Sequence, residues 1–306
     1  MTGSNRARTL GALIVVGMGV GAALTGCATD DSAAQERASA SAASASAEAA
    51  RATAAANAKF AADFVVADQQ IVTKKGPARV AAFDTRAKLV CADSSMAQRL
   101  KKFKDAGKIE TIKYLPDNET TVLATHNSVA DPNKVVVVFR NNNAAKPAEK
   151  HRAIPIQIVL GEHAGSPCVS EWKSMGAGSP AESGLTGKEK FAAEFVTTSP
   201  ITFVPPGKAR AESFAKTKAM VCPGSAMAKN ATQMQGQLDQ YKYSPGFKIK
   251  VLTAFAGQNP SNVLVIAATA PLDADAGKAK EGAASVYRIE VGDNAGAPCV
   301  SAQEVL

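Results

Sequence analysis

One sequence unit occurs twice in the chain, and this repeat limits the folds that the chain can adopt. The segment Lys59–Val65, with the sequence KFAADFV, recurs 131 positions later as KFAAEFV at Lys190–Val196. Near the other end of the unit, AGSPCVS at Ala164–Ser170 recurs as AGAPCVS at Ala295–Ser301, again 131 positions later. Two copies of about 115 residues each are long enough to bury a core of their own. The chain is therefore predicted to contain two homologous domains in tandem.

The composition of the chain distinguishes a linker between the two copies and a tether before them. Residues 57–175 and 188–306 hold the copies, and residues 176–187 between them are rich in Gly, Ser and Pro, as linkers are. Residues 27–56 form an Ala/Ser-rich tether, of which the part from Ala47 onward has the composition to continue into the first domain helix. Because the linker offers almost nothing that could be buried between the copies, we expect each copy to fold independently.

Each copy begins with helix signals and continues with strand signals. Phe60 and Phe64 lie four apart on one helical face, and Pro77 begins a second helix with apolar residues at helical spacing over 80–90. The basic stretch Met96–Lys104 predicts a third, short helix. Strand-like runs separated by turn signals follow at residues 109–114, 120–125, 135–139, 154–160 and 169–172. This order predicts an α+β fold in which N-terminal helices pack on a mostly antiparallel four- to five-stranded sheet.

The repeat also decides how four of the five cysteines pair. Cys91 and Cys168 lie 77 positions apart in the first copy, and Cys222 and Cys299 lie 77 positions apart in the second. Four cysteines allow three pairings, but only one joins equivalent positions within each copy. We therefore predict the disulfides Cys91–Cys168 and Cys222–Cys299, each joining the second helix to the last strand. The sequence contains no Cys-x-x-Cys, and no His near a Cys repeats in both copies, so neither a metal site nor a thiol redox site is predicted.

The fifth cysteine ends a segment with the order of a secretory signal peptide. Arg6 and Arg8 form a basic region, an apolar region runs from Leu10 to Leu24, and Leu24-Thr25-Gly26-Cys27 closes the segment. Two other interpretations are an uncleaved transmembrane helix and an ordinary signal peptide with an incidental cysteine. The first is disfavoured because the segment is only about as long as the minimum span and contains glycines that weaken a helix interior.

The closing motif resembles the lipobox of bacterial lipoproteins. The resemblance implies that residues 1–26 are removed, that the Cys27 thiol carries a diacylglyceryl group, and that Cys27 becomes the mature N-terminus. The two acyl chains would anchor the protein durably in the membrane. Because a secretory signal peptide exports the chain, the resemblance places it on the extracytoplasmic face of the cell membrane. The sequence contains no second apolar run long enough to span a bilayer, and the four remaining cysteines suit that oxidising compartment.

The formal net charge of +8 has two interpretations. A basic surface on an anchored protein would attract anionic lipid head groups or anionic wall polymers, whereas the simpler interpretation is solubility. The sequence lacks a run of five like charges and any basic patch interleaved with aromatic residues. Nucleic acid is therefore not an expected partner, and the oligomeric state is left open.

No pattern in the chain predicts a catalytic, cofactor-binding or metal-binding site. His126, His151 and His163 all lie in the first copy, and the second copy has Asn294 at the position of His163, in a loop where a small polar residue suits a turn. Nucleophile-elbow, P-loop and His-Glu-x-x-His motifs are absent from the sequence. We therefore expect that the chain is not an enzyme and that it uses no cofactor.

Polar residues that both copies share are better candidates for a role in the unit. They are Asp63 and Glu194, Arg79 and Arg210, Lys113 and Lys242, Tyr114 and Tyr243, and Ser170 and Ser301. We expect the acid on the first helix to pair with the arginine on the second, which is a structural role. An acid and a tyrosine facing a cavity would instead indicate proton transfer. Trp172 has Gln303 as its counterpart, which favours local packing for the tryptophan.

Helices followed by a curved antiparallel sheet resemble the nuclear transport factor two-like (cystatin-like) fold. Duplicated versions with disulfides are similar to extracytoplasmic lipoproteins of high-GC Gram-positive bacteria. The fold resemblance also implies a cone-shaped cavity, in which some members act as isomerases or dehydratases.

Two functions from different classes follow from these observations. The first is non-catalytic binding of an envelope protein, a lipid or a wall component, and the absence of a duplicated catalytic set favours it. The alternative is an isomerase-like cavity enzyme, or a small-ligand or lipid carrier, that uses one domain. A pocket in which polar groups converge in one copy only would favour the alternative.

Overall fold

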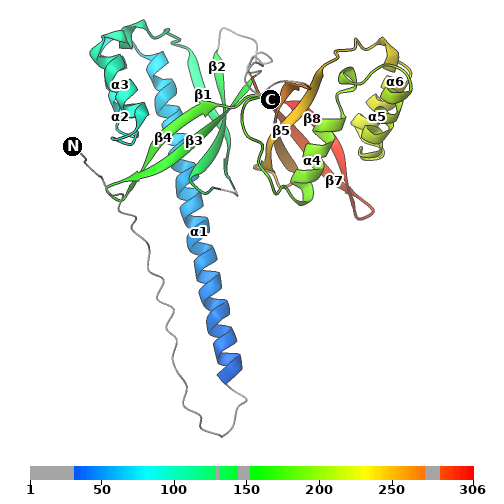
Figure 1. Ribbon diagram of the computed structural model, residues 1–306, viewed down its shortest axis with the longest axis horizontal. Coiled ribbons are helices and arrows are strands. Elements are labelled where there is room, and N and C mark those ends of the chain that lie inside the picture. Colours follow the sequence, from blue (N-terminus) through cyan, green and yellow to red (C-terminus); the bar gives the residue numbers. More distant parts are fainter. Residues whose placement is uncertain (1–30, 129–130, 144–151, 273–282) are drawn as a thin grey trace, which may run out of the picture. The chain divides into compact units, whose positions relative to one another are not determined.

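The computed structural model describes residues 31–128, 131–143, 152–272 and 283–306 of the chain (Figure 1). Residues 50–306 belong to one compact unit, and the described residues 31–49 belong to a separate one. The predicted signal peptide and Cys27 lie outside the described residues. Nothing in the structure therefore bears on the lipobox, and lipidation stays a prediction.

The first repeat has helices followed by a four-stranded sheet, as the sequence predicts. Its helices are α1 (Asp31–Gln70), α2 (Gly76–Ala87) and α3 (Ser95–Asp105), with the 3-10 helices η1 (Ile71–Thr73) and η2 (Lys108–Thr111). Its strands are β1 (Asn118–Asn127), β2 (Lys134–Asn143), β3 (Ala153–His163) and β4 (Ser166–Ser174). All neighbouring strands are antiparallel, in the order β1-β2-β3-β4.

The second repeat has the same order of elements. Its helices are α4 (Gly187–Thr198), α5 (Lys208–Ala219) and α6 (Ala226–Gln235), with η4 (Ile201–Phe203) and η5 (Leu238–Gln240). Its strands are β5 (Phe247–Ala256), β6 (Asn262–Pro271), β7 (Ser285–Asn294) and β8 (Ala297–Val305), antiparallel in the order β5-β6-β7-β8. The predicted α+β fold is therefore confirmed, with four strands in each sheet.

One predicted strand, at residues 109–114, is wrong. The chain forms η2 over Lys108–Thr111 instead. The carbonyls of Ile109 and Ile112 accept hydrogen bonds from the guanidinium of Arg79, so they are not part of a sheet ladder. The other four predicted strands of this repeat lie within β1 to β4.

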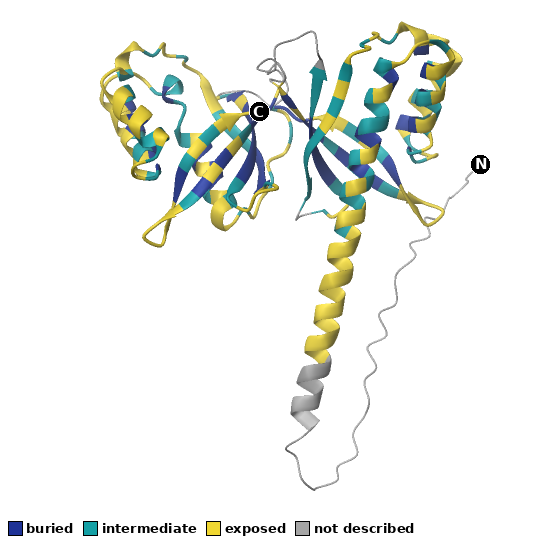
Figure 2. Cartoon of the chain, turned by 180° about the vertical axis from the view of Figure 1, so that it is seen from behind, coloured by how far each residue is buried: buried dark blue, intermediate teal, exposed yellow. Residues whose placement is uncertain are grey.

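Helix α1 begins earlier than the sequence indicates. The composition predicts a helix from Ala47 onward, but α1 begins at Asp31. Alanine has the highest helix propensity, so an Ala-rich stretch can be helical without a packed apolar face. Residues 39–53 are exposed along α1 (Figure 2). The described part of the tether is therefore helical, but its described side chains before residue 54 add nothing to the core.

The last turns of α1 cover one face of the first sheet. Phe64 and Val65 are almost fully buried in a cluster that also contains Val135 and Val137 of β2. In the second repeat, Phe195 of α4 lies in the equivalent cluster over β6 and β7. This packing explains why the KFAA[DE]FV motif recurs, because its apolar residues form the helix face that meets the sheet.

The opposite faces of the two sheets contribute to one shared cluster. Val137 faces the α1 cluster, whereas its neighbours Val136 and Val138 pack with Leu264 and Ile266 of β6. Strand β2 is therefore buried on both faces, as its continuous run of valines indicates. The shared cluster consists of Val136, Val138, Ala153, Met175, Leu252, Phe255, Leu264, Ile266, Ala268, Ala284, Val286 and Leu306.

The linker takes part in the contact between the repeats. The carboxylate of Glu182 is 9% exposed and accepts hydrogen bonds from the hydroxyl of Ser128, at 3.0 Å, and from the hydroxyl of Thr253. The expectation that the segment from Gly176 to Gly184 buries almost nothing between the copies is therefore wrong at Glu182. A main-chain hydrogen bond of 2.9 Å from Ala153 N–H to the carbonyl of Leu306 also joins the repeats.

Both disulfides join the cysteines that occupy equivalent positions in the repeats. Cys91, just after α2, is bonded to Cys168 on β4. Cys222, just after α5, is bonded to Cys299 on β8. The N–H of Cys91 also donates to the carbonyl of Val169 at 2.9 Å. Each cystine therefore fastens the end of the second helix of its repeat to the last strand.

Candidate functional site

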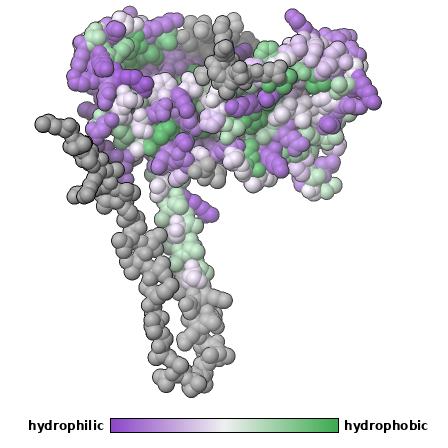
Figure 3. All heavy atoms as spheres, viewed as in Figure 1, coloured by the Kyte–Doolittle hydropathy of each residue, from purple (hydrophilic) through white to green (hydrophobic). Residues whose placement is uncertain are grey.

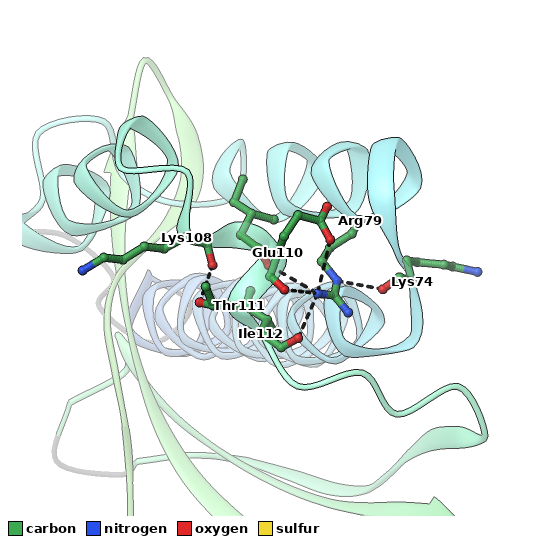
Figure 4. Close-up of polar contacts among 7 residues, drawn as sticks. Lys74, Arg79, Lys108, Glu110, Thr111 and Ile112 are labelled. Atoms are coloured by element: carbon green, nitrogen blue, oxygen red, sulfur yellow. Dashed lines mark hydrogen bonds and ion pairs between the residues drawn. The ribbon is translucent and has the colours of Figure 1, made fainter.

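The shared arginine of the first repeat holds main-chain carbonyls rather than a ligand. Arg79 is 2% exposed. Its Nε donates to the carbonyl of Lys74 at 2.7 Å, and its Nη1 donates to the carbonyls of Ile112, at 2.8 Å, and Glu110, at 3.2 Å (Figure 4). The Glu110 carboxylate lies 3.6 Å from Nη1 and is 54% exposed, so the main-chain contacts dominate. Arg79 therefore fixes the loop between α3 and β1.

The second repeat uses Arg210 in the same way. Arg210 is fully buried, and its Nη1 donates to the carbonyls of Leu238, at 2.9 Å, and Tyr241, at 2.8 Å. By contrast, the carboxylate of Asp63 pairs with Lys59 at 2.6 Å on the surface. The predicted pair between the helix acid and the arginine is therefore wrong. The planar guanidinium has several N–H donors, so one arginine can bind several main-chain carbonyls at once.

The other shared polar residues fix the sheet or lie at the surface. The hydroxyl of Ser170 donates to the carbonyl of Val159 at 3.0 Å, and Ser301 donates to the carbonyl of Glu290 at 3.3 Å. Both bonds lie at the irregularities in strand register. Exposed residues are Glu194, Lys113, Lys242, Tyr114 and Tyr243. The shared acids and tyrosines therefore do not form the cavity pair that would indicate proton transfer.

A pocket of about 380 Å³ lies between the helices and the last strand of the second repeat. We call it the second-repeat pocket. Its lining consists of Phe195, Ser199, Phe214, Thr217, Lys218, Val221, Ala226, Met227, Asn230, Ala231, Met234, Ser301, Ala302 and Gln303. Most of the walls are apolar, and the polar groups are hydroxyls, amides and one lysine.

Several polar groups of the second-repeat pocket already have partners. The Thr217 hydroxyl donates to the carbonyl of Thr198 at 3.1 Å, and Lys218 Nζ donates to the side chain of Gln235 at 2.8 Å. The amides of Asn230 and Gln303 make no hydrogen bond to the residues that the structure describes. These two amides are therefore available to a ligand in the pocket.

A second pocket, of about 330 Å³, lies in the first repeat. We call it the first-repeat pocket. It is lined by Asp68, Ile71, Val72, Phe83, Arg86, Arg99, Leu100, Phe103 and Ile112. Its walls are also apolar, but its polar groups are charged.

The two pockets occupy matching places in the repeats. Six lining positions coincide at the offset of 131, namely Asp68 and Ser199, Phe83 and Phe214, Arg86 and Thr217, Arg99 and Asn230, Leu100 and Ala231, and Phe103 and Met234. Trp172 packs against the α1 cluster, whereas Gln303 at the equivalent position lines the second-repeat pocket. Gln303 therefore brings β8 into the lining of the second-repeat pocket, and Ser199, Thr217 and Asn230 replace the three charged residues of the first-repeat pocket.

The charges of the first-repeat pocket form a buried ion pair. Arg86 Nε lies 2.8 Å from the carboxylate of Asp68, and their side chains are 9% and 19% exposed. Burial raises the pKa of Asp68, a shift that the Arg86 guanidinium opposes. Burial likewise lowers the pKa of Arg86, against the attraction of Asp68. Loss of hydration therefore outweighs mutual attraction for both partners.

The histidines have separate environments. His126 of β1 stacks on Phe255 of β5, with ring centroids 4.6 Å apart, and its Nε2 lies 3.4 Å from the Glu182 carboxylate. Burial lowers the pKa of His126, and the Glu182 carboxylate opposes this shift. His163 is exposed at the end of β3, and His151 lies outside the described residues. His126 and Glu182 line an opening between the repeats of about 320 Å³.

The described residues contain no group of three His, Cys, Asp or Glu side chains that could hold a metal ion. Within the same part of the chain, no helix combines the length and the apolar character needed to cross a bilayer. On the face shown in Figure 3, hydrophilic and hydrophobic residues alternate in small areas over both repeats. The two pockets, which occupy equivalent places in the repeats, are therefore taken as candidate ligand sites.

Sequence reasoning missed Asp68, Arg86 and Glu182. Apart from Ser301, the polar residues common to both copies lie elsewhere, whereas the other polar pocket positions are ones at which the copies differ. Asp68 is replaced by Ser199 and Arg86 by Thr217. The signal in the sequence is that an acid and a base on neighbouring helices of the first copy are both replaced by neutral residues in the second copy.

No protein-family model and no curated protein matches the chain. Among solved structures, the chain is similar to one described as an "Ntf2 like protein involved in plasmid conjugation", with 9% sequence identity. The match covers 80% of this chain and 94% of that chain, with a TM-score of 0.21. Such a low TM-score means that the two chains superpose only loosely.

Proposed function

We propose that the chain is a non-catalytic binding protein of the cell envelope, held at the extracytoplasmic face of the membrane by a lipid on Cys27. Its ligand is a small, largely apolar molecule that enters the second-repeat pocket. Two disulfides suit an oxidising compartment, and the N-terminal motif supports the anchor. An envelope protein or an anionic wall polymer is a further candidate partner, because the chain has a formal net charge of +8.

The second-repeat pocket carries this proposal. Its volume of about 380 Å³ suits a small ligand, and its walls combine aromatic and aliphatic side chains with a few polar groups. Asn230 and Gln303 offer amide donors and acceptors to a hydroxyl, carbonyl or amide of the ligand. Some lining residues are smaller than their counterparts in the first repeat, among them Ala231 in place of Leu100.

The polar groups of the pocket favour binding over catalysis. Among the described residues that line it, there is no carboxylate and no imidazole, the groups that most often transfer protons at neutral pH. The alternative, a cavity enzyme, would use Asp68 in the first-repeat pocket, where burial raises its pKa. Its carboxylate is already paired with Arg86 and accepts a hydrogen bond from Gln69 at 3.0 Å. We therefore favour binding.

We also propose that each repeat is a variant of the nuclear transport factor two-like fold. The proposal is based on the order of elements in each repeat, in which three helices precede four antiparallel strands and the helices cover one face of the sheet. In that fold the space between helices and sheet is the usual ligand cavity, and both pockets include helix residues from this layer.

The test is to fill the second-repeat pocket with the side chains of the first repeat. Ala231→Leu with Met234→Phe installs residues that the first repeat accommodates at the same positions. The probe is N-phenyl-1-naphthylamine, a neutral dye whose fluorescence rises in apolar surroundings. We expect the filled variant to bind the dye at least about tenfold more weakly than the unchanged chain.

The matched control is Ala211→Leu, which makes the same change at an exposed position of α5. It should bind the dye normally, and thermal unfolding should show that both variants are folded. Equal dye binding by the filled variant and the control would overturn the second-repeat pocket as the ligand site.

A further inference from the structure

The first-repeat pocket differs from the second in charge, and we propose that it binds the carboxylate head of a small amphiphile. Two arginines and one aspartate line it, together with an apolar wall. At neutral pH these groups sum to one net positive charge. This is a second site, in the other repeat and with a different ligand class, so it does not rest on the function proposed for the second-repeat pocket.

Arg86 is held in place but is not fully satisfied. It is 7% exposed, and its Nε lies 2.8 Å from the Asp68 carboxylate. Its guanidinium carbon lies 5.6 Å from the ring centre of Phe64. The two Nη atoms form no hydrogen bond to the residues that the structure describes. They are therefore available for the paired hydrogen bonds that a guanidinium makes with a carboxylate.

A chain of side-chain hydrogen bonds orients the ion pair from the sheet. Asn141 Nδ2 on β2 donates to the side-chain oxygen of Gln69 at 3.0 Å, and Gln69 Nε2 donates to the Asp68 carboxylate at 3.0 Å. Asp68 in turn faces Arg86. Gln69 and Asn141, which do not line the pocket, thus orient the Asp68 carboxylate that faces Arg86, and this preorganisation reduces the entropy lost on binding.

Burial of the pair is unfavourable, and the fold does not require it. Desolvation outweighs attraction for both Asp68 and Arg86, as the opposite shifts of their pKa values indicate. The second repeat builds the same helix layer with Ser199 and Thr217 in their places. A buried ion pair that the homologous unit does without is better explained by a ligand than by folding.

The walls select an amphiphile over a small inorganic anion. Six of the nine lining residues are apolar, namely Ile71, Val72, Phe83, Leu100, Phe103 and Ile112. An apolar body would displace water from these walls, whereas an inorganic anion would leave them hydrated. Arg99, which is exposed at the same pocket, adds a second guanidinium near the head group.

The probes are octanoate, 1-octanol and inorganic phosphate, titrated by calorimetry at low salt. The protein is the full chain carrying Cys27→Ala, so that no attached acyl group competes with the probe. We expect octanoate to bind roughly tenfold more tightly than 1-octanol, because only octanoate offers a charge to the arginines. Phosphate should bind more weakly than octanoate, because it has no apolar body.

Two variants assign the binding to this pocket. Arg99→Asn replaces an exposed arginine with the residue of the second repeat, and it should weaken octanoate binding by roughly fivefold without changing 1-octanol binding. Asp68→Ser with Arg86→Thr installs both residues of the second repeat and should abolish the preference for octanoate. Thermal unfolding of each variant shows whether it is folded, and Arg99→Asn keeps the test valid if the double variant is not.

Lys218→Ala is the matched control, because it removes a cation from the second-repeat pocket instead. It should leave octanoate binding unchanged. Equal affinity for octanoate and 1-octanol would overturn the proposal, as would phosphate binding as tight as that of octanoate. Octanoate binding that responds to Lys218→Ala and not to Arg99→Asn would place the anion in the other repeat and would equally overturn it.

Discussion

The imidazole of His126 lies flat on the ring of Phe255, with the ring planes 3° apart and the centroids 4.6 Å apart. His126 belongs to β1 of the first repeat and Phe255 to β5 of the second. Glu182 of the linker lies beside them, with its carboxylate 3.4 Å from His126 Nε2. An ionisable ring therefore takes part in the contact that joins the two repeats.

We predict that the stability of the chain depends on pH through His126. Burial lowers the pKa of His126 below its usual 6.5, although Glu182 acts in the opposite direction. Below pH 6.5 the unfolded chain consequently binds more protons at this residue than the folded chain does. The free energy of unfolding should therefore be fully retained above pH 6.5 and should fall as the pH drops toward the folded pKa.

Urea unfolding between pH 7.5 and 5 measures this dependence, and His126→Phe isolates it. Phenylalanine keeps an aromatic ring against Phe255 but cannot take up a proton, so the variant should lose less stability on acidification than the unchanged chain. His163→Gln removes an exposed histidine and is the control for the loss of any histidine. If His126→Phe follows the same pH curve as the control, His126 is not the group responsible.

Replacement of Arg79 by lysine should destabilise the first repeat strongly. Lysine cannot reach the carbonyls of Lys74, Glu110 and Ile112 together, so buried carbonyls would lose their donors. We expect a loss of about 3 kcal/mol in the free energy of unfolding, measured by urea titration. Arg152→Lys, at an exposed position, should change stability by less than about 0.5 kcal/mol. A similar small effect for Arg79→Lys would mean that water replaces the guanidinium.

The sequence predicted the parts of the fold that follow from pattern and duplication. The helical spacing of apolar residues from Phe60 onward, and the turn signals between apolar runs, were enough to predict that helices precede strands in each repeat. Equal spacing of Cys91 to Cys168 and of Cys222 to Cys299 sufficed for the pairing seen in the structure. Each of these inferences uses residues close in sequence or equivalent in the two copies.

The sequence could not predict what depends on contacts between distant segments. Residues 109–114 have the composition of a strand, but Arg79 takes the carbonyls that a sheet would use. The valines of β2 could indicate a buried strand but not that the second repeat covers its other face. Asp68 and Arg86 look like ordinary helix-surface charges until the helices are packed together.

Lipidation of Cys27 can be tested independently of the fold. Replacement by alanine removes the thiol that a diacylglyceryl group would occupy, so Cys27→Ala should be released or should accumulate as a longer, unprocessed precursor. Labelling of growing cells with a palmitate analogue measures this directly. Cys91→Ser with Cys168→Ser is the control, because it removes other cysteines and should keep the label. Label that persists in Cys27→Ala would exclude the lipobox interpretation.

The two disulfides differ in how closely a glycine approaches them. A Cβ on Gly161 would lie 3.0 Å from Cys91 Sγ, and one on Gly292 would lie 3.3 Å from Cys222 Sγ. Because each of these sulfur atoms is held in a disulfide bond, it cannot move away from an added methyl group as the end of a flexible side chain can. Gly161→Ala should therefore lower the free energy of unfolding by about 1–3 kcal/mol, and Gly292→Ala by less. Gly236→Ala, which meets nothing within 4 Å, is the control in the same urea titrations.

The shared cluster predicts how the repeats behave when they are separated. Residues 50–175 alone would expose Val136 and Val138, and residues 176–306 alone would expose Ile266, all of which are almost fully buried in the full chain. Each buried valine or isoleucine contributes about 1.5–3 kcal/mol relative to exposure. We therefore expect each fragment, with its disulfide formed, to unfold at a lower temperature than the full chain. Mixed in equal amounts, the fragments should associate, as sedimentation would show. If the fragments neither associate nor lose thermal stability, the repeats are independent domains, as their linker composition indicates, and the shared cluster contributes little.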